Sequence, residues 1–270
     1  MRDLRVTLVQ SMLHWEDAVA NRYMFTEKLA TLAGTTDLIV LPEMFTTGFT
    51  MRASELAETM DGPTVTWMRQ QALDLGAALY GSVIIGEKGQ YFNRGLLVDV
   101  HGHVTGYDKR HLFRFANEHM HYSAGGQRVV VDLHGWRILL QVCYDLRFPV
   151  FSRNRSDYDL VLYVANWPEA RRYPWSQLLI ARAIENQAYV VGVNRVGMDG
   201  KGIHYSGDSV AIDPRGEVLR WNGWSPPGAE GADLSGREFI ATVTLDRGAM
   251  EEFRTKFPAA LDADAFDLHL

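Results

Sequence analysis

Short apolar runs typical of β-strands alternate with helical patterns along the whole chain of 270 residues, and no linker, repeat or low-complexity tract interrupts them. This alternation favours a single α/β architecture. The run at 37–43 is nearly all apolar, which is typical of a strand buried on both faces. The expected strands lie at residues 5–10, 37–43, 77–86, 91–100, 103–107, 129–133, 136–142, 158–165, 189–193, 208–212, 218–221 and 239–245.

Three segments have the periodicity of helices that bury one face. The first runs from about Ala18 to Gly34, and the second begins at Pro63 and ends at Gly76, a residue suited to a helix end. The third begins at Pro174 and runs to about Gln187. The tail at 251–270 has no clear pattern, so we expect it to be loosely structured or packed on a partner.

The composition excludes several classes of protein. The formal net charge is −6 and no basic stripe is visible, which argues against a nucleic-acid partner. The longest apolar runs are too short for a bilayer span, and the start of the chain lacks the apolar segment of a signal peptide. We therefore expect a cytoplasmic protein without a membrane partner.

Three of the strand-like runs lead directly into a reactive side chain. Glu43 ends the run LPE at 41–43, Lys109 lies in DKRHLF at 108–113, and Cys143 begins CYDLRFP at 143–149. Taken singly, a surface glutamate, a surface lysine and a small buried cysteine would be ordinary. Cys143 is the one cysteine of the chain, so it forms no intrachain disulfide and no cysteine-based zinc cluster.

Taken together, these motifs resemble the nitrilase (carbon–nitrogen hydrolase) superfamily. The resemblance covers nearly the whole chain, because the runs NWP at 166–168, RAIENQ at 182–187, SGDS at 206–209 and DPRGE at 213–217 follow in the family's order. It implies one domain over 1–270 with a four-layer α-β-β-α sandwich fold. It also implies a homodimer or larger homo-oligomer, with the tail at about 251–270 at the interface.

The resemblance further implies a catalytic triad of Glu43 as general base, Lys109 as oxyanion donor and Cys143 as nucleophile. The backbone N–H of Tyr144 would be the second oxyanion donor. Glu118 matches a second glutamate found in many amidase branches, where it would orient the lysine or the substrate; a solvated loop carboxylate is the alternative. No metal and no organic cofactor is expected.

The run from Asn166 to Tyr173 resembles the omega-amidase branch, which implies hydrolysis of the terminal amide of 2-oxoglutaramate or 2-oxosuccinamate. Asn166 and Trp167 are then expected to bind the substrate. An arginine would suit its carboxylate, and of the adjacent Arg171 and Arg172 we favour Arg172. Two alternatives stay open: another small amide or N-carbamoyl compound on the same triad, and a non-catalytic protein that interacts through its thiol.

Overall fold

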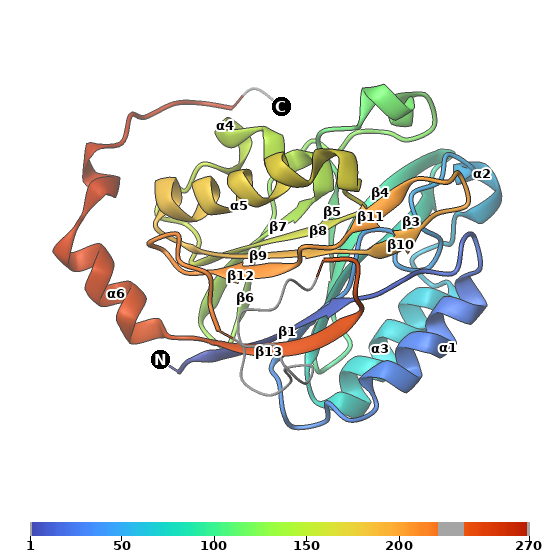
Figure 1. Ribbon diagram of the computed structural model, residues 1–270, viewed down its shortest axis with the longest axis horizontal. Coiled ribbons are helices and arrows are strands. Elements are labelled where there is room, and N and C mark those ends of the chain that lie inside the picture. Colours follow the sequence, from blue (N-terminus) through green and yellow to red (C-terminus); the bar gives the residue numbers. More distant parts are fainter. Residues whose placement is uncertain (1, 221–234, 269–270) are drawn as a thin grey trace.

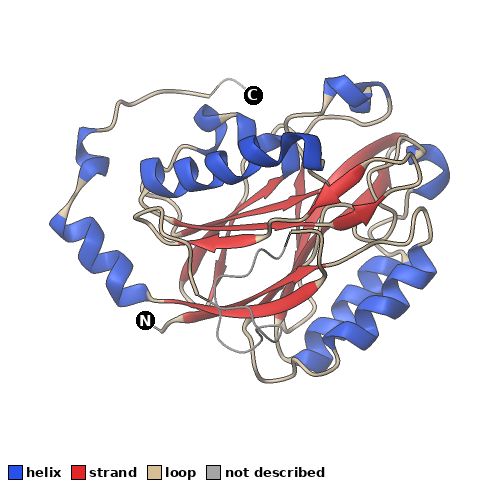
Figure 2. Cartoon of the chain, viewed as in Figure 1, coloured by secondary structure: helices blue, strands red, loops and turns tan. Residues whose placement is uncertain are grey.

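Two β-sheets packed face to face form the centre of the protein, and helices cover both outer faces (Figure 1, Figure 2). The computed structural model describes residues 2–220 and 235–268. Helices α1 and α3 lie outside the first sheet, and α5 lies outside the second. The predicted four-layer α-β-β-α sandwich is therefore confirmed.

The first sheet has six strands in the order β13-β1-β2-β3-β4-β5, with β1, β2 and β3 parallel and the other neighbours antiparallel. Its strands are β1 (Leu4–Gln10), β2 (Leu38–Val40), β3 (Ala78–Glu87), β4 (Gln90–Val98), β5 (Val104–Asp108) and β13 (Phe239–Leu245).

The second sheet has five strands in the order β12-β9-β8-β7-β6, with β7, β8 and β9 parallel. Its strands are β6 (Val130–Leu133), β7 (Trp136–Val142), β8 (Leu160–Ala165), β9 (Tyr189–Asn194) and β12 (Val210–Ile212). A separate pair joins β10 (Val196–Met198) to β11 (His204–Ser206).

The helices and the 3-10 turns complete the layers and their connections. The α-helices are α1 (Ala18–Leu29), α2 (Ala53–Leu56), α3 (Pro63–Leu75), α4 (Pro149–Ser152), α5 (Arg172–Asn186) and α6 (Arg247–Lys256). The 3-10 helices are Arg114–Ala116, Glu118–Met120, Cys143–Arg147, Glu169–Arg171 and Ala259–Asp262. None of the helices in the described ranges is long and apolar enough to cross a membrane.

The core follows from this layering. One hydrophobic cluster joins the facing sides of the two sheets, where residues of β1 and β13 meet residues of β7, β8 and β9. A second cluster lies between the first sheet and the two helices α1 and α3. All three residues of β2 are buried, because the strand is covered on both faces, as its apolar sequence predicts.

Most of the predicted helices and strands are present. Two hairpin turns set the register of the strands that they connect. Lys88 and Gly89 connect β3 to β4, and His134 and Gly135 connect β6 to β7, all four with positive φ. Two-residue turns of this kind match the right-handed twist of the strands that they join.

Four sequence predictions need correction. Helix α1 ends at Leu29, before Gly34, and α5 begins at Arg172, two residues before Pro174. In place of the strand predicted at 218–221, the described part contains a single bridge from Val218 to Ile212; Trp221 lies outside the described residues. The tail is not loosely structured at its start, because residues 251–256 belong to α6.

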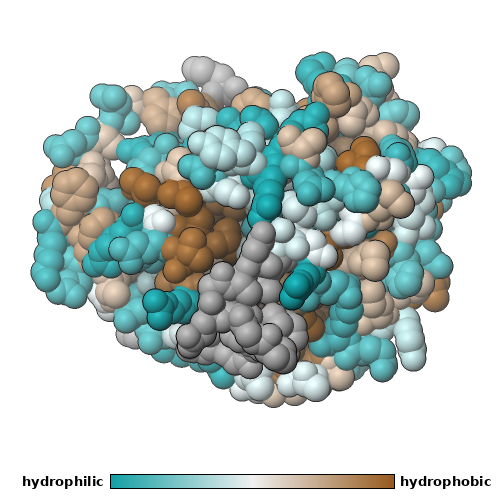
Figure 3. All heavy atoms as spheres, in the orientation of Figure 1, coloured by the Kyte–Doolittle hydropathy of each residue, from teal (hydrophilic) through white to brown (hydrophobic). Residues whose placement is uncertain are grey.

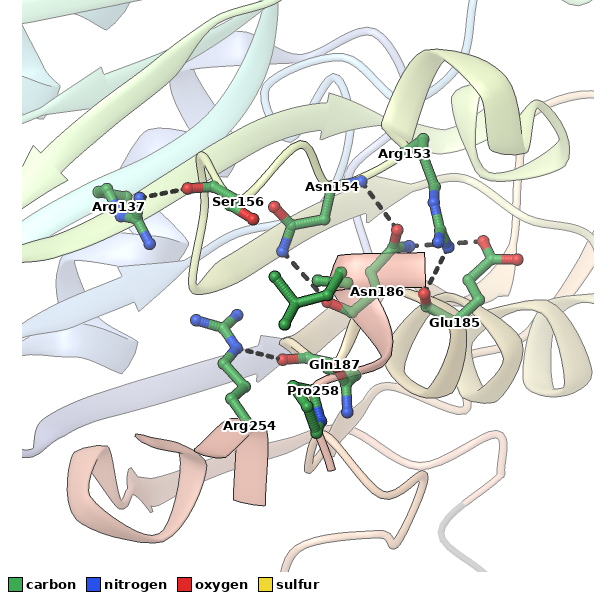
Figure 4. Close-up of a pocket in the computed structure, with 11 residues that line it drawn as sticks. Arg137, Arg153, Asn154, Ser156, Glu185, Asn186, Gln187, Arg254 and Pro258 are labelled. Carbon is green, nitrogen blue, oxygen red and sulfur yellow. Dashed lines mark hydrogen bonds between the residues drawn. The ribbon is translucent and has the colours of Figure 1, made fainter. Parts of the chain in front are cut away.

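Helix α6 and the turn that follows it border a cavity with a volume of about 260 Å³ at the end of α5 (Figure 4). Arg254 Nε donates to the carbonyl oxygen of Gln187 at 2.8 Å, which joins α6 to the end of α5. The face of the molecule in view is mostly hydrophilic, with a hydrophobic area beside α5 (Figure 3).

Candidate active site

The ends of three strands bring Glu43, Lys109 and Cys143 together. Glu43 follows β2 by three residues, Lys109 follows β5 directly, and Cys143 follows β7 directly. The two sheets face each other, so strand ends from both sheets meet at one point between them. Lys109 and Cys143 line an open cavity with a volume of about 410 Å³.

Lys109 lies between two carboxylates at the inner end of this cavity. Its Nζ is 2.9 Å from Glu43 Oε1 and 3.0 Å from both carboxylate oxygens of Glu118. All three side chains are fully buried. A buried charge needs a partner of opposite sign, and each of these ions has at least one.

Glu43 has further donors on both of its oxygens. Asn93 Nδ2 donates to Oε1 at 2.7 Å, and the backbone N–H of Asn166 donates to Oε2 at 2.7 Å. Asn166 Nδ2 also donates to the Glu43 carbonyl oxygen at 2.6 Å. These donors hold the Glu43 carboxylate in one orientation, which suits a base.

The charges around Lys109 determine its ionisation. Burial lowers the pKa of Lys109, but the negative charges of Glu118 and Glu43 outweigh burial and hold the pKa well above its usual value. Burial raises the pKa of Glu118, and the Lys109 ammonium opposes that rise. Lys109 is therefore a protonated donor at neutral pH.

The surroundings of the Cys143 side chain favour its neutral thiol form over the thiolate. Burial raises its pKa well above the usual value, the charge of Glu43 adds to this, and Lys109 opposes it. The backbone of Cys143 has a φ of 48°, a left-handed conformation that is uncommon for a residue with a side chain. Strained residues of this kind cluster at functional sites, and here the conformation leads from β7 straight into a 3-10 helix.

Asp145 fixes the turn that carries Cys143. Its carboxylate is fully buried and accepts from the Tyr107 hydroxyl at 2.8 Å, from the His111 backbone N–H at 2.9 Å and from the Val142 N–H at 3.0 Å. The segment around Lys109 and the turn around Cys143 are thereby joined through one side chain.

Of the predicted substrate-binding residues, Asn166 and Trp167 line the cavity, as does Tyr144, the predicted oxyanion donor. Arg172 does not; its guanidinium is bonded to Asp208, with Nη2 at 2.8 Å and Nε at 3.0 Å from Oδ1. The neighbouring Arg171, over which Arg172 was preferred, is the one that lines the cavity.

Arg147, Arg171 and Lys201 line the cavity in addition to Lys109, and the lining also contains the carboxylate of Asp199. The Arg147 guanidinium lies 5.1 Å from the Trp167 ring centroid, and the Arg171 guanidinium lies 4.9 Å from that of Phe115. Aromatic faces attract a guanidinium and hold it in one orientation.

Sequence reasoning missed Asn93, the cavity position of Arg147 and the contacts of Asp145, and it considered Arg171 but preferred Arg172. Asn93 could have been found from the hairpin register, because the predicted strands at 91–100 and 103–107 bring it opposite Lys109. Within residues 2–220 and 235–268, no group of three or more His, Cys, Asp or Glu side chains could hold a metal ion. The expectation that no metal or cofactor is needed stays a prediction.

This chain is similar to known proteins in its sequence and in its fold. Residues 5–255 match the model of the carbon-nitrogen hydrolase family. The omega-amidase YafV of Escherichia coli K12 is 50% identical over 268 residues, which are 99% of this chain and 100% of that one. The 2-oxoglutaramate amidase of Bacillus subtilis is 35% identical over 82% of this chain and 83% of its own.

A crystal structure from Xanthomonas campestris has the same fold, with a TM-score of 0.93 and 49% identity over the whole of both chains. That structure is described as a CN-hydrolase superfamily protein with an arsenic adduct in the active site.

Proposed function

The chain belongs to the carbon–nitrogen hydrolase family, and from that premise we propose that it hydrolyses the terminal amide of small oxo-dicarboxylic acid monoamides, such as 2-oxoglutaramate and 2-oxosuccinamate. The products are the oxo-dicarboxylic acid and ammonia. The observation that carries the proposal is one cavity in which Cys143 and Lys109 share a wall with the cations Arg147 and Arg171. The 50% identical omega-amidase supports the same substrate class.

In the first half of the reaction, the Glu43 carboxylate takes the proton from the Cys143 thiol as the sulfur attacks the amide carbon. The carbonyl oxygen becomes an oxyanion next to the Lys109 ammonium and the Tyr144 backbone N–H. Tyr144 lies in the first turn of a 3-10 helix, where N–H groups lack a partner within the helix. The carbon–nitrogen bond then breaks, and Glu43 returns its proton to the departing ammonia.

In the second half, water attacks the thioester carbonyl carbon. Glu43 takes a proton from the water, the carbon–sulfur bond breaks, and the proton returns to the Cys143 sulfur. Glu118 holds Lys109 in place through both halves, because both of its oxygens lie 3.0 Å from Lys109 Nζ. The raised pKa of Lys109 keeps the ammonium charged while the oxyanion forms.

The cationic wall suits a substrate with a carboxylate at the end remote from its amide. Arginine pairs with a carboxylate through two parallel hydrogen bonds, which gives orientation as well as attraction. A neutral amide of the same length would lack this contact and would bind less tightly.

The test is ammonia release from a panel of amides by the full chain and by Cys143→Ala. The panel contains 2-oxoglutaramate, 2-oxosuccinamate, a neutral aliphatic amide and an N-carbamoyl amino acid. We expect turnover of the two oxo-acid amides above the other compounds, and loss of all turnover in Cys143→Ala. Turnover confined to the neutral or carbamoyl compound would replace the substrate class, and turnover that persists in Cys143→Ala would exclude the thioester.

The setting of the enzyme is a further part of the proposal. We expect it to work in the cytoplasm as a homodimer or larger homo-oligomer, with residues at about 251–270 at the interface.

A further inference from the structure

Asn93 lies on β4 at the position opposite Lys109. Arg94 pairs with Asp108 in the register of β4 and β5, and the backbone N–H of Lys109 donates to the Asn93 carbonyl oxygen at 3.0 Å. Side chains of directly opposed residues in an antiparallel pair point to the same face of the sheet. The fully buried Asn93 side chain therefore lies on the same side as Lys109.

The Asn93 amide bridges the two carboxylates of the site. Nδ2 donates to Glu43 Oε1 at 2.7 Å and is 3.3 Å from Glu118 Oε1. Two carboxylates around one ammonium repel each other, and an amide N–H stabilises both without adding charge. The shorter of the two bonds goes to Glu43, so the stabilisation is greater there.

We propose that Asn93 is a positioning residue for the hydrolysis, which holds the Glu43 carboxylate in its orientation toward the Cys143 thiol. This inference rests on the proposed function, because it assumes that Glu43 is the base. Without the amide donor, Glu43 would keep Lys109 on Oε1 and the Asn166 N–H on Oε2. The carboxylate would then bind its proton at higher pH and would remove the thiol proton less readily at a given acidic pH.

The groups that face the two carboxylates from the surrounding elements are Lys109, Cys143, Tyr80, Tyr122 and Tyr205. Burial raises the pKa of each of the three tyrosines, and of Cys143, above its usual value. The pKa of Lys109 is raised as well. None of them changes charge on the acid side of neutrality, so the acid limb of activity reports on the two carboxylates.

The experiment compares wild type with Asn93→Ala and Asn93→Asp. Asn93→Ala removes the donor, and Asn93→Asp keeps the shape but replaces the donor by a charged acceptor. Two quantities are measured against pH: kcat/KM for 2-oxoglutaramate, and the rate of Cys143 alkylation by iodoacetamide. The loss of one hydrogen bond to a charged group should move the acid limb of both profiles upward by about one pH unit in Asn93→Ala. Asn93→Asp should move it at least as far.

Asn186→Ala is the matched control. Asn186 is a buried asparagine like Asn93, but its Nδ2 donates to the backbone carbonyl oxygen of Arg182. It should lose stability without a shift of the acid limb. A cooperative melting curve shows that each variant is folded. If Asn93→Ala does not fold, the pH profiles of Asn93→Asp still test the inference.

The outcomes separate this inference from the proposed function. If the variants are slower at every pH but the acid limb of their profiles does not shift, Asn93 has only a structural role and the inference is overturned. If wild type releases no ammonia from any amide while the alkylation limb still shifts in the variants, the proposed substrate fails and the role of Asn93 stands.

Discussion

At the scale of single residues, Arg171 carries the most direct prediction about substrate choice. Its guanidinium lies in the cavity wall beside the rings of Phe113 and Phe115, at 5.4 and 4.9 Å from their centroids. Arg171→Met keeps the apolar contacts and removes the charge. We expect kcat/KM for 2-oxoglutaramate to fall about 10- to 100-fold, mainly through KM, because one charged hydrogen-bonding contact is lost.

The control for this prediction is Arg172→Met, which alters the neighbouring arginine outside the cavity. Its guanidinium is engaged with Asp208, so the ratio of rates on charged and neutral amides should stay unchanged. Steady-state kinetics on 2-oxoglutaramate and a neutral amide measure both variants. If Arg171→Met slows both amides by the same factor, the arginine does not recognise the carboxylate.

The same two residues show where sequence reasoning fails. The motifs indicate that an arginine after NWP belongs in the cleft, but they do not distinguish Arg171 from Arg172. Adjacent residues in a helical turn point about 100° apart, so one of them lies outside the cavity. The choice depends on Asp208, which is 36 positions further along the chain and bonds Arg172. Glu43, Lys109 and Cys143 could be predicted as one group because each follows a strand and matches a family motif.

At the scale of elements, the end of helix α3 can be tested with one methyl group. Gly76 ends the helix with a φ of 62°, and its N–H bonds to the carbonyls of Ala72 and Leu73. A Cβ added there would meet no atom within 4 Å, so Gly76→Ala introduces only the left-handed backbone strain. We expect urea unfolding to show a loss of about 1 kcal/mol.

Gly126 provides the comparison, because a Cβ there also meets nothing within 4 Å and its φ lies outside the left-handed range. Gly126→Ala should change the free energy of unfolding by less than about 0.5 kcal/mol. Equal losses in the two variants would show that backbone strain at Gly76 is not the cause.

The elements that can be predicted from the sequence are those whose determining residues lie within the element itself. Helix α3 was predicted well because its apolar spacing, Pro63 and Gly76 all lie within the element. Helix α6 was missed because its contacts are remote: Arg254 bonds to Gln187 and Asp159. The strands β10 and β11 have three residues each, too few for a recognisable alternation.

At the scale of the whole molecule, Asp159 joins the C-terminal helix to the second sheet. Its fully buried carboxylate binds Arg137 of β7 and both Arg247 and Arg254 of α6, at 2.8 to 3.0 Å. Burial opposes ionisation, but the hydrogen bonds from Arg137 and Arg254 outweigh it and hold the pKa of Asp159 well below its usual range. No local pattern could predict this contact, because it joins residues separated by 88 and 95 positions in α6.

Asp159→Asn should therefore destabilise the fold by about 3 kcal/mol at pH 7, because three guanidiniums lose their common anion. A carboxylate with a depressed native pKa stabilises the fold above its unfolded pKa of about 3.9, and this stabilisation declines as the pH falls toward the native pKa. The difference in unfolding free energy between wild type and variant should consequently be about 1 kcal/mol smaller at pH 3 than at pH 7. Urea unfolding at the two pH values measures it. Asp132→Asn, at an exposed carboxylate that accepts from the Gly135 N–H, should change the free energy of unfolding only slightly at either pH. A loss for Asp159→Asn that is the same at both pH values would mean that packing, rather than the charge of Asp159, holds α6 against the sheet.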